Sequence, residues 1–448
     1  MNVVLRGVRV IDPLEDVDRA GQDVWLRDGR LLASGARVEA PGASVVDLRR
    51  RRGAPWVLCP GFIDLHAHLR EPGETSRETI ESGAEAAAAG GFTQVVAMAN
   101  TRPVIDTPER VASAQLRAVG VAVWVLTTAS VTRGQQGDEL VDIAGCAAAG
   151  ASCFSDDGRN AASPALLADA LRAAARVGST VLVHPEDEEM IVRANPDGVS
   201  VTRCPARPPD AEVAAVASAV QALRGAGRGR LHLQHLSARD SVEQLRRARD
   251  QGLAVSAEVT PHHLAMWLPM EREPQPPSLR KVNPPLRTQR DREAVVHALR
   301  DGVIDAVATD HAPHRLADKD GEYADAAPGM IGLETALATC LTLGAMGGDW
   351  LPVLVERLTA GPWRVLGEAA GLSRPTLRGD AGLTCTLFDP DAEWEVGAHP
   401  FRSLSANTPL LGVRLRGRVL LTLVDGRVAH LGITDPPIPG FVEAFGDS

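Results

Sequence analysis

The central part of the chain alternates between short apolar runs and segments in which apolar residues recur at helical spacing. Eight of the runs have the length of a strand and end at turn residues. They cover residues 61–69, 93–100, 121–130, 151–157, 179–184, 229–236, 253–261 and 304–311. Helical spacing is clearest at 166–177, 211–223 and 291–299. Strands that alternate with helices in this way predict an α/β fold, a (β/α)8 TIM barrel, which carries its active site at the carboxyl ends of the strands.

One helix start and one helix end can be predicted from local signals. Thr75 and Glu78 have the spacing of a capping box, and Gly90-Gly91 ends the apolar pattern that follows. We therefore expect a helix that opens at Thr75 and runs through Ala89.

The two ends of the chain have a different pattern, in which apolar and polar residues alternate as in half-buried strands. The pattern covers residues 3–11, 23–27, 44–48, 384–388, 413–415 and 419–430. Asp28-Gly29 and Asp425-Gly426 are typical hairpin turns. We expect both ends to form one small β-sandwich domain, residues 1–57 and 372–448, beside a barrel domain at 58–371.

Composition narrows the classes of function. The chain has 448 residues, of which 44% are hydrophobic and 23% charged, as in a soluble globular protein. Its net charge of −10 argues against nucleic acid as a partner. We find no charged-then-apolar leader and no uncharged run of spanning length, so we expect no membrane partner and a cytoplasmic location. The six cysteines show no Cys-x-x-Cys spacing and are expected to be reduced thiols.

The stretch from Asp64 to Arg70 carries the first chemical signal. Residues two apart on a strand point to the same face, so His66, His68 and Arg70 should project together. Imidazoles hold borderline metals such as zinc, and a guanidinium can bind a carboxylate with two hydrogen bonds. The alternative is a pair of core histidines whose nitrogens are satisfied by backbone groups. A hydrolytic metal centre requires further ligands elsewhere in the chain.

Further ligand-type side chains stand at the ends of other predicted strands. They are Asn100, Ser155-Asp156-Asp157-Gly158, His184, His235 and Thr309-Asp310-His311-Ala312-Pro313-His314. Each has a structural explanation by itself, such as a helix cap or a buried histidine with a satisfied ring. Together they would surround one barrel mouth, which favours a functional site.

Four histidines and two aspartates can hold two metal ions with a carboxylate between them. Two cations that share a water lower its pKa from about 15.7 towards neutrality, and they polarise a carbonyl under attack. An aspartate that touches this water can take its proton and pass it to a leaving nitrogen. The set of residues therefore indicates an enzyme that opens or closes a C–N amide bond.

Several motifs in the chain resemble those of a known family. They are PGFIDLHAHLREPG (60–73), GGFTQVVAMANTRPV (90–104), FSDDG (154–158), HPED (184–187), AEVTPHHL (257–264), VNPPLR (282–287), DREA (291–294) and ATDHAPH (308–314). Together they make the chain similar to the class I dihydroorotases of the amidohydrolase superfamily over nearly its whole length. The resemblance implies zinc-dependent, reversible cyclisation of N-carbamoyl-L-aspartate to L-dihydroorotate in pyrimidine biosynthesis.

The resemblance also implies roles for individual residues. Two Zn²⁺ ions are preferred over one, the first bound by His66 and His68 and the second by His184 and His235. Asp157 would bridge them, with Asp156 as the second choice, and Asp310 would bind the first metal and act as general base and acid. The residues expected to contact the substrate are His68, Arg70, Asn100, Asn283, His314, Pro328 and Gly329. His262 and His263 are expected to have packing or supporting roles.

Two other functions stay open from the sequence. Hydantoinases and allantoinases are cyclic-amide hydrolases that resemble a version in which a carboxylated lysine bridges the metals. The two lysines of this chain, Lys281 and Lys319, lie outside the fourth predicted strand, which favours an aspartate bridge. A pseudo-dihydroorotase, an inactive scaffold for aspartate carbamoyltransferase, would have lost metal ligands, whereas all six are present here. Self-association into a homo-oligomer is expected, and association with aspartate carbamoyltransferase stays open.

Overall fold

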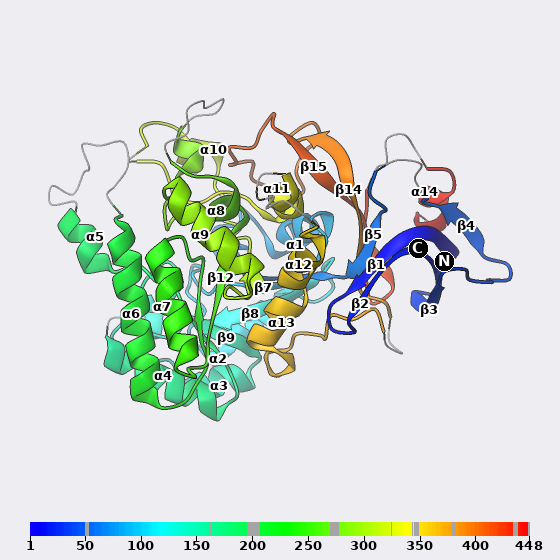
Figure 1. Ribbon diagram of the computed structural model, residues 1–448. Helices are drawn as coiled ribbons and strands as arrows, with labels where there is room; N and C mark the ends of the chain where they lie inside the picture. Colours follow the sequence, from blue (N-terminus) through cyan, green and yellow to red (C-terminus); the bar gives the residue numbers. More distant parts are fainter. Residues whose placement is uncertain are drawn as a thin grey trace.

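The computed structural model describes residues 1–49, 53–160, 163–194, 207–268, 277–323, 325–342, 344, 349–378, 382–432 and 438–446. These residues form two eight-stranded sheets. One sheet is built from the middle of the chain, and the other combines strands from both ends, drawn in blue and in orange to red in Figure 1.

The first sheet is the barrel, whose parallel strands follow one another in chain order. Its strands are β6 (Phe62–Ala67), β7 (Phe92–Ala97), β8 (Trp124–Ala129), β9 (Ala151–Ser155), β10 (Val181–Val183), β11 (Leu231–Leu233), β12 (Val255–Val259) and β13 (Ala306–Val307). An isolated bridge between Ala67 and His311 joins the first strand to the segment after the last. The N–H of His68 donates to the carbonyl of His311 at 2.8 Å in the same place. The predicted strands and the barrel are confirmed.

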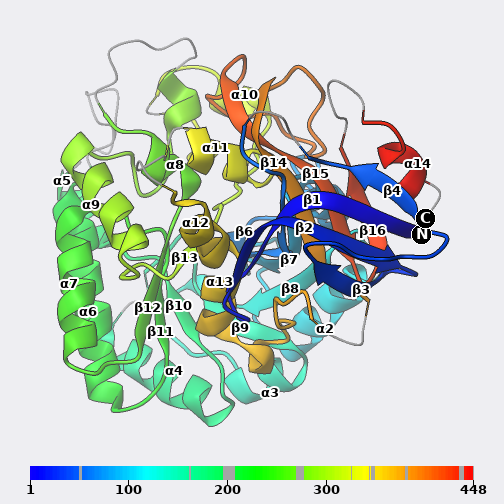
Figure 2. The same ribbon diagram turned by 45° about the vertical axis from the view of Figure 1, so that its right-hand side comes forward.

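Helices surround the barrel, and in both views α6, α7 and α9 cover the side away from the terminal sheet (Figures 1 and 2). The α-helices are α1 (Ile80–Ala89), α2 (Pro108–Arg117), α3 (Ile143–Ala148), α4 (Pro164–Arg176), α5 (Glu188–Ala194), α6 (Pro209–Ala226), α7 (Arg239–Asp250), α8 (Pro261–Ala265), α9 (Gln289–Arg300), α10 (Leu316–Lys319), α11 (Ala336–Thr342), α12 (Leu351–Leu358), α13 (Ala360–Leu366) and α14 (Phe441–Phe445). Short 3-10 helices lie at Arg133–Gln135, Pro277–Arg280, Leu333–Thr335 and Glu368–Ala370. The helices predicted at 166–177, 211–223 and 291–299 are α4, α6 and α9.

The predicted start of α1 is wrong by about one turn. Thr79 is the N-cap residue, because its hydroxyl accepts the N–H of Ser82 while the Ser82 hydroxyl accepts the N–H of Thr79, both at 3.0 Å. Glu78 caps nothing here, since its buried carboxylate lies 3.2 Å from Nε2 of His311. The predicted end is correct, because Gly90 is the C-cap. The true capping pair, Thr79 and Ser82, has the same spacing as the predicted one.

The second sheet has the strand order β16-β15-β14-β5-β1-β2-β3, with β4 paired to β1. Its strands are β1 (Asn2–Asp12), β2 (Val17–Arg27), β3 (Arg30–Gly35), β4 (Ser44–Asp47), β5 (Val57–Pro60), β14 (Cys385–Glu395), β15 (Arg414–Val424) and β16 (Arg427–Leu431). The sheet from both termini is therefore confirmed. Because β5 pairs with β1 and β14, the predicted domain boundary at residue 58 falls within one of its strands, and the exact domain limits stay a prediction.

The hairpin turns from the two ends of the chain touch each other. Gly29 and Gly426 both have positive φ, +72° and +76°, as the predicted turns require. A Cβ atom at Gly29 would lie 2.7 Å from the Cα of Gly426, so neither turn can carry a side chain at this contact. The close approach fixes the N-terminal hairpin against the C-terminal one.

Two large clusters of buried apolar side chains correspond to the two sheets. The larger one packs barrel strands against their helices and includes Phe62, Phe92 and Phe154. The other lies within the terminal sheet and includes Leu26 and Phe441. Each sheet therefore has a core of its own, which is typical of two packed domains.

Two observations bear on the expectations from composition. No helix in the described part of the chain combines the length and the apolar character needed to cross a bilayer. The described cysteines are buried free thiols, at positions 59, 146, 153, 340 and 385. Cys204 lies outside the described residues.

Candidate active site

Two groups of ligand-type side chains meet at the carboxyl ends of the barrel strands. The first contains His66, on β6, His68, just after it, and Asp157, which follows β9. The distance is 3.2 Å from His66 Nε2 to Asp157 Oδ1 and 3.4 Å from His68 Nε2 to Asp157 Oδ2. All three side chains are buried. Three ligand atoms therefore surround one position of the size of a cation.

The second group contains the same Asp157. Its Oδ1 lies 3.5 Å from Nδ1 of His184, which follows β10, and 3.8 Å from Nε2 of His235, which follows β11. The two imidazoles are themselves 2.8 Å apart, between His235 Nε2 and His184 Nδ1. Asp157 thus lies between two pairs of histidines, which is the position of a bridging carboxylate.

Asp156 points away from both groups. Its Oδ1 accepts the N–H of Val131 at 2.8 Å and the N–H of Thr132 at 3.0 Å. Burial raises the pKa of this carboxyl, while these hydrogen bonds act in the opposite direction. The geometry therefore gives Asp156 a role in holding the loop after β8 and places Asp157, not Asp156, among the histidines.

Hydrogen bonds behind three of the imidazoles fix which nitrogen faces Asp157. They join His66 Nδ1 to Glu258 (2.9 Å), His68 Nδ1 to Asn100 (2.9 Å) and His184 Nε2 to Glu186 (3.0 Å). In each ring the outer nitrogen donates its proton to an oxygen, so the other nitrogen is left to face the centre. Ligating histidines in metal sites are oriented in this way.

Three buried atoms of these two groups, among them Nδ1 of His235, have no hydrogen-bond partner among the described residues, and two of the three lie at the centre. These two are Nε2 of His66 and Oδ1 of Asp157, which face each other. Buried polar atoms are normally satisfied, and a cation between these two would satisfy both. Imidazole nitrogens and carboxylate oxygens are ligands of zinc and of several other divalent ions. The residues present therefore fit a metal centre.

The electrostatics of the centre point the same way. Burial opposes a charge on His184, yet Asp157 and Glu186 raise its pKa to about 9. Burial also opposes ionisation of Asp157, but His66, His184 and His235 hold its pKa well below the usual range. The negative potential that favours protonated imidazoles is the potential that attracts a divalent cation.

Asp310 lies beside the first group. It follows β13, and its Oδ1 is 3.1 Å from Nε2 of His68 and 3.6 Å from Nε2 of His66. Burial alone would raise the pKa of Asp310, but the two histidines more than offset this effect and hold it below the usual range. The carboxylate is therefore ionised at neutral pH and can accept a proton at this position.

Strained backbone coincides with the centre. Arg70, His235 and Asp310 have φ angles of +58°, +32° and +47°, in the left-handed region that side chains other than glycine rarely adopt. Such residues are concentrated at functional sites, where the surrounding structure maintains the strain. The backbone of Arg70 therefore departs from the regular strand geometry of β6, and the expectation that its side chain projects together with those of His66 and His68 stays a prediction.

The side chain of Arg70 contacts the segment that follows Asp310. Its Nε donates to the carbonyl of Pro313 at 3.2 Å, and a terminal nitrogen lies 3.4 Å from Nε2 of His314. Arg70 forms no ion pair with any residue in the described ranges. Nε2 of His314 donates to the carbonyl of Pro328 at 2.9 Å, so these expected substrate contacts do lie together. An unpaired guanidinium at a buried mouth is suited to an anionic ligand.

The other residues predicted to contact or support the site differ in their surroundings. Asn100 bonds His68 and also donates to Asp157 Oδ2 at 3.2 Å, so it supports two ligands directly. Asn283 is half-buried, and its side chain makes no hydrogen bond within the described part of the chain. His263 is held between the Thr260 hydroxyl, at 2.8 Å, and a backbone carbonyl, as expected for packing.

Two residues of the site, Glu258 and Glu186, were not predicted from the sequence. Glu258 contacts His66 with one oxygen and Nε2 of His232 with the other, at 3.0 Å. Burial would raise the pKa of Glu258, but His232 and His66 lower it to about 2. A signal was present, because Glu258 is the one charged residue of its strand and Glu186 stands two residues after His184.

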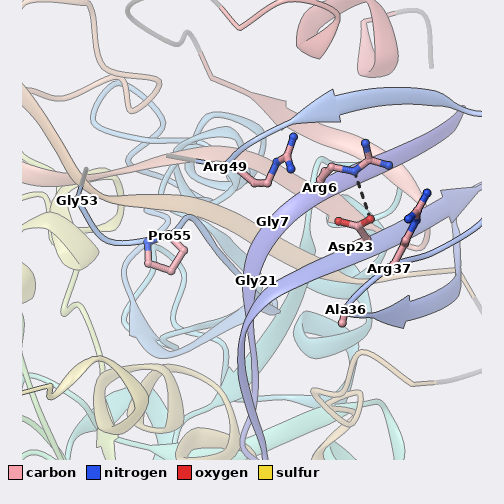
Figure 3. A pocket seen from close by; sticks show the side chains of 9 residues that line it. All are labelled: Arg6, Gly7, Gly21, Asp23, Ala36, Arg37, Arg49, Gly53 and Pro55. Atoms are coloured by element: carbon pink, nitrogen blue, oxygen red, sulfur yellow. Dashed lines mark hydrogen bonds and ion pairs between the residues drawn. The ribbon is translucent and has the colours of Figure 1, made fainter. Parts of the chain in front are cut away.

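A separate hollow of about 430 Å³ lies on the terminal sheet and contains none of these residues (Figure 3). Arg6, Arg37 and Arg49 line it. Arg6 is paired with Asp23 at 3.3 Å and Arg49 with Asp47 at 2.8 Å, so two of the three guanidinium groups are already neutralised. The barrel mouth therefore remains the candidate active site.

Several known proteins with similar sequences carry the same name. A family model described as "Dihydro-orotase-like" matches residues 56–200. A protein of Anaeromyxobacter dehalogenans (strain 2CP-1 / ATCC BAA-258) named "Dihydroorotase" is 42% identical over 432 residues, which cover 95% of this chain and 97% of the relative. A protein of the same name from Aquifex aeolicus (strain VF5) is 34% identical and covers 96% of this chain and 99% of the relative.

Solved structures share the fold. An L-hydantoinase (dihydropyrimidinase) from Arthrobacter aurescens matches with a TM-score of 0.79 and 25% identity over 95% of each chain. A dihydropyrimidinase from Brevibacillus agri NCHU1002 matches with a TM-score of 0.80 and 21% identity, covering 99% of this chain and 98% of that one. The predicted architecture, a TIM barrel with a β-sandwich formed by both termini, agrees with these structures.

Proposed function

Because the chain belongs to the dihydroorotase family, we propose that its barrel mouth catalyses the reversible cyclisation of N-carbamoyl-L-aspartate to L-dihydroorotate. The protein is then a cyclic amidohydrolase of pyrimidine biosynthesis. The observation that supports this most strongly is the position of Asp157, which both pairs of histidines share while Asp310 lies beside the first pair. An aspartate in this position needs no lysine to bridge the metals.

The two groups around Asp157 suit two Zn²⁺ ions. His66, His68 and Asp310 would hold the first, His184 and His235 the second, and Asp157 both. When bound, the ions lower the pKa of a water and polarise the amide carbonyl. Glu258, Asn100 and Glu186 keep three of the imidazoles oriented through the hydrogen bonds described above.

Asp310 is the proposed general base and acid. In ring opening its carboxylate takes a proton from the attacking water and gives it to the ring nitrogen as the C–N bond breaks. In ring closure it takes a proton from the carbamoyl nitrogen and gives it to the departing oxygen. The lowered pKa of Asp310 keeps the carboxylate in the ionised form that a general base requires.

Arg70 is proposed to bind the substrate α-carboxylate together with His314 and Asn100. The absence of an ion pair on Arg70 among the described residues leaves its guanidinium available for this group. A charge-assisted hydrogen bond of this kind contributes about 1.5–3 kcal/mol. The side chain of Asn283 and the backbone at Pro328 and Gly329 are proposed to contact the ring amide and keto groups. His68 is the remaining residue that is proposed to contact the substrate.

The similarity of the fold to hydantoinases supports one alternative, hydrolysis of a cyclic amide without a carboxylate. Turnover of dihydroorotate, dihydrouracil, hydantoin and allantoin should be measured side by side with the purified, zinc-loaded protein. Dihydroorotate is expected to be the best substrate by a wide margin. Comparable or faster turnover of hydantoin or dihydrouracil would contradict the proposal, and no turnover of any of them would favour an inactive scaffold. Cytoplasmic location, self-association and contact with aspartate carbamoyltransferase stay predictions.

A further inference from the structure

A residue from the C-terminal part of the chain reaches the proposed carboxylate site. Asn407 lies in the connection between β14 and β15 and is 0% exposed. Its Oδ1 accepts the N–H of His314 at 2.9 Å, and its Nδ2 donates to the carbonyls of Ala312 at 3.0 Å and Gly329 at 3.2 Å. Its backbone carbonyl accepts the N–H of Ile331 at 3.1 Å. The whole side-chain amide is used to join two neighbouring segments of the barrel mouth.

These two segments carry the groups expected to recognise the substrate. Arg70 donates to the carbonyl of Pro313, which stands between Ala312 and His314, two residues that the Asn407 side chain binds. His314 donates to the carbonyl of Pro328, which directly precedes Gly329, the third residue that the Asn407 side chain binds. The backbone on which Arg70 and His314 rest is therefore held by Asn407.

The position of Gly329 depends on such support. Its φ is +125°, and a Cβ atom there would lie 2.6 Å from the Cβ of Ala312, so the two segments are closely opposed. The carbonyl of Gly329 accepts a second hydrogen bond, at 2.9 Å, from the buried ammonium of Lys319. Without hydrogen-bond donors from other segments, such as Asn407 and Lys319, the buried carbonyl groups of these two segments would be unsatisfied.

The connection that carries Asn407 is itself anchored to the barrel. Glu334 accepts the N–H of Arg402 at 2.9 Å and the N–H of Ser403 at 3.1 Å. The hydroxyl of Ser405 donates to the carbonyl of Arg77 at 2.8 Å. The connection is therefore held in place, and Asn407 contacts the barrel mouth from a fixed position.

We propose that Asn407 is a positioning residue for substrate recognition, holding Arg70 and His314 in the geometry that receives the substrate carboxylate. It acts through the backbone of residues 312–314 and 329–331 and touches no reacting atom. This inference rests on the proposed function, because the carboxylate site belongs to that function.

Asn407→Asp tests the inference. The variant keeps the size of the side chain and the acceptor for His314, but an oxygen replaces the nitrogen that donates to two carbonyls. We expect KM for dihydroorotate to rise about 10-fold while kcat changes less than about 3-fold, because substrate binding and not the chemistry is disturbed. Bound zinc should be unchanged. In an Arg70→Met background the effect of Asn407→Asp on KM should largely disappear, because both changes act on one group of contacts.

Thr422→Val is the matched control, since it removes a buried hydrogen bond, from the Thr422 hydroxyl to the carbonyl of Ala88 at 2.7 Å, outside the connection that carries Asn407. It should leave KM unchanged. A fall in kcat at constant KM, or full additivity with Arg70→Met, would overturn the inference. If Asn407→Asp does not fold, Asn407→Ser gives a second comparison, because it removes the amide donor without placing a negative charge beside the two carbonyls.

Hydrogen exchange separates this inference from the proposed function. In Asn407→Asp the amides of His314 and Ile331 should exchange about 10-fold faster than in the wild-type protein, because the carbonyls of Ala312 and Gly329 lose their donor and the segments that carry both amides open more often. If the wild-type protein fails to act on dihydroorotate, the proposed function fails while this measurement still decides whether Asn407 holds the mouth. Unchanged exchange at both amides would overturn the inference.

Discussion

Glu258 Oε1 lies 2.9 Å from Nδ1 of His66, on the side of the imidazole opposite to the nitrogen that faces Asp157. The second oxygen of Glu258 is occupied by His232, so the carboxylate cannot turn away. A carboxylate in this position orients a ligating imidazole and increases its basicity. The metal centre therefore extends beyond the residues that would touch the metals.

Replacing Glu258 should weaken metal binding while the fold remains. Glu258→Gln keeps the shape of the side chain and removes its charge, so we expect the zinc affinity to fall about 10–100-fold, as for other partners of ligating histidines. Competition with a chelator measures this affinity. Glu334→Gln, which alters a buried carboxylate bound to the backbone of residues 402–403, should leave it unchanged. Equal affinities for Glu258→Gln and the wild-type protein would contradict the assignment.

Asp310→Asn should abolish most turnover. The amide cannot accept the proton of the attacking water, and loss of general acid–base catalysis alone costs about 10²–10⁴-fold in kcat. The circular dichroism spectrum and Tm should remain close to those of the wild-type protein. Near-normal turnover in a zinc-loaded Asp310→Asn protein would remove Asp310 from its proposed role.

Arg70→Met should affect substrates according to their charge. We expect kcat/KM for dihydroorotate to fall about 10²-fold or more, because the substrate carboxylate would be desolvated without a partner. Dihydrouracil lacks this carboxylate and should lose much less. An equal loss on both substrates would mean that Arg70 serves the fold or the metals.

The two adjacent aspartates should behave differently when replaced. Asp157→Ala removes the carboxylate shared by both histidine pairs, so the protein should lose bound zinc, measured by mass spectrometry, and most of its activity. Asp156→Ala should keep its zinc but lose about 1–3 kcal/mol of stability, because the N–H groups of Val131 and Thr132 lose their acceptor. Zinc loss in Asp156→Ala and not in Asp157→Ala would reverse the assignment.

Reloading the metal-free protein tests whether Asp157 bridges without help. A carboxylated lysine forms only when bicarbonate supplies its carboxyl group, whereas an aspartate already carries one. We expect zinc added in bicarbonate-free buffer to restore the same activity as zinc added with bicarbonate. A requirement for bicarbonate would contradict the aspartate bridge and the main argument against a hydantoinase.

The barrel and the residues at its mouth could be predicted because they depend on local sequence. Most residues of the barrel strands are apolar, and ligand-type residues follow within a few positions of the strand ends, as at His184 and His235. Once the strands are placed in parallel, their carboxyl ends meet at one mouth. Spacing favoured Asp157 over Asp156 as the bridging ligand. The choice between them depends on the direction in which each side chain points, and the sequence does not give this direction.

What could not be predicted depends on contacts between distant segments. The contact of Glu258 with His66 joins residues 192 positions apart. The contact of Asn407 with His314 spans 93 positions. Arg70 departs from the strand because its backbone enters the left-handed region, which a pattern of apolar positions does not encode. The capping box at Thr79 was missed because two adjacent segments, 75–78 and 79–82, carry the same spacing, and Glu78 of the first segment contacts His311, which is distant in the sequence.

The bridge between Ala67 and His311 has a consequence for the stability of the barrel. Strand β13 has two residues, so few backbone hydrogen bonds close the gap between the last strand and the first. His66 and His68 stand on one side of this seam and Asp310 on the other, so a cation held by all three would cross-link it. Removing the metal should therefore loosen the seam before the rest of the barrel. Catalysis and closure of the fold would then share the same ligands.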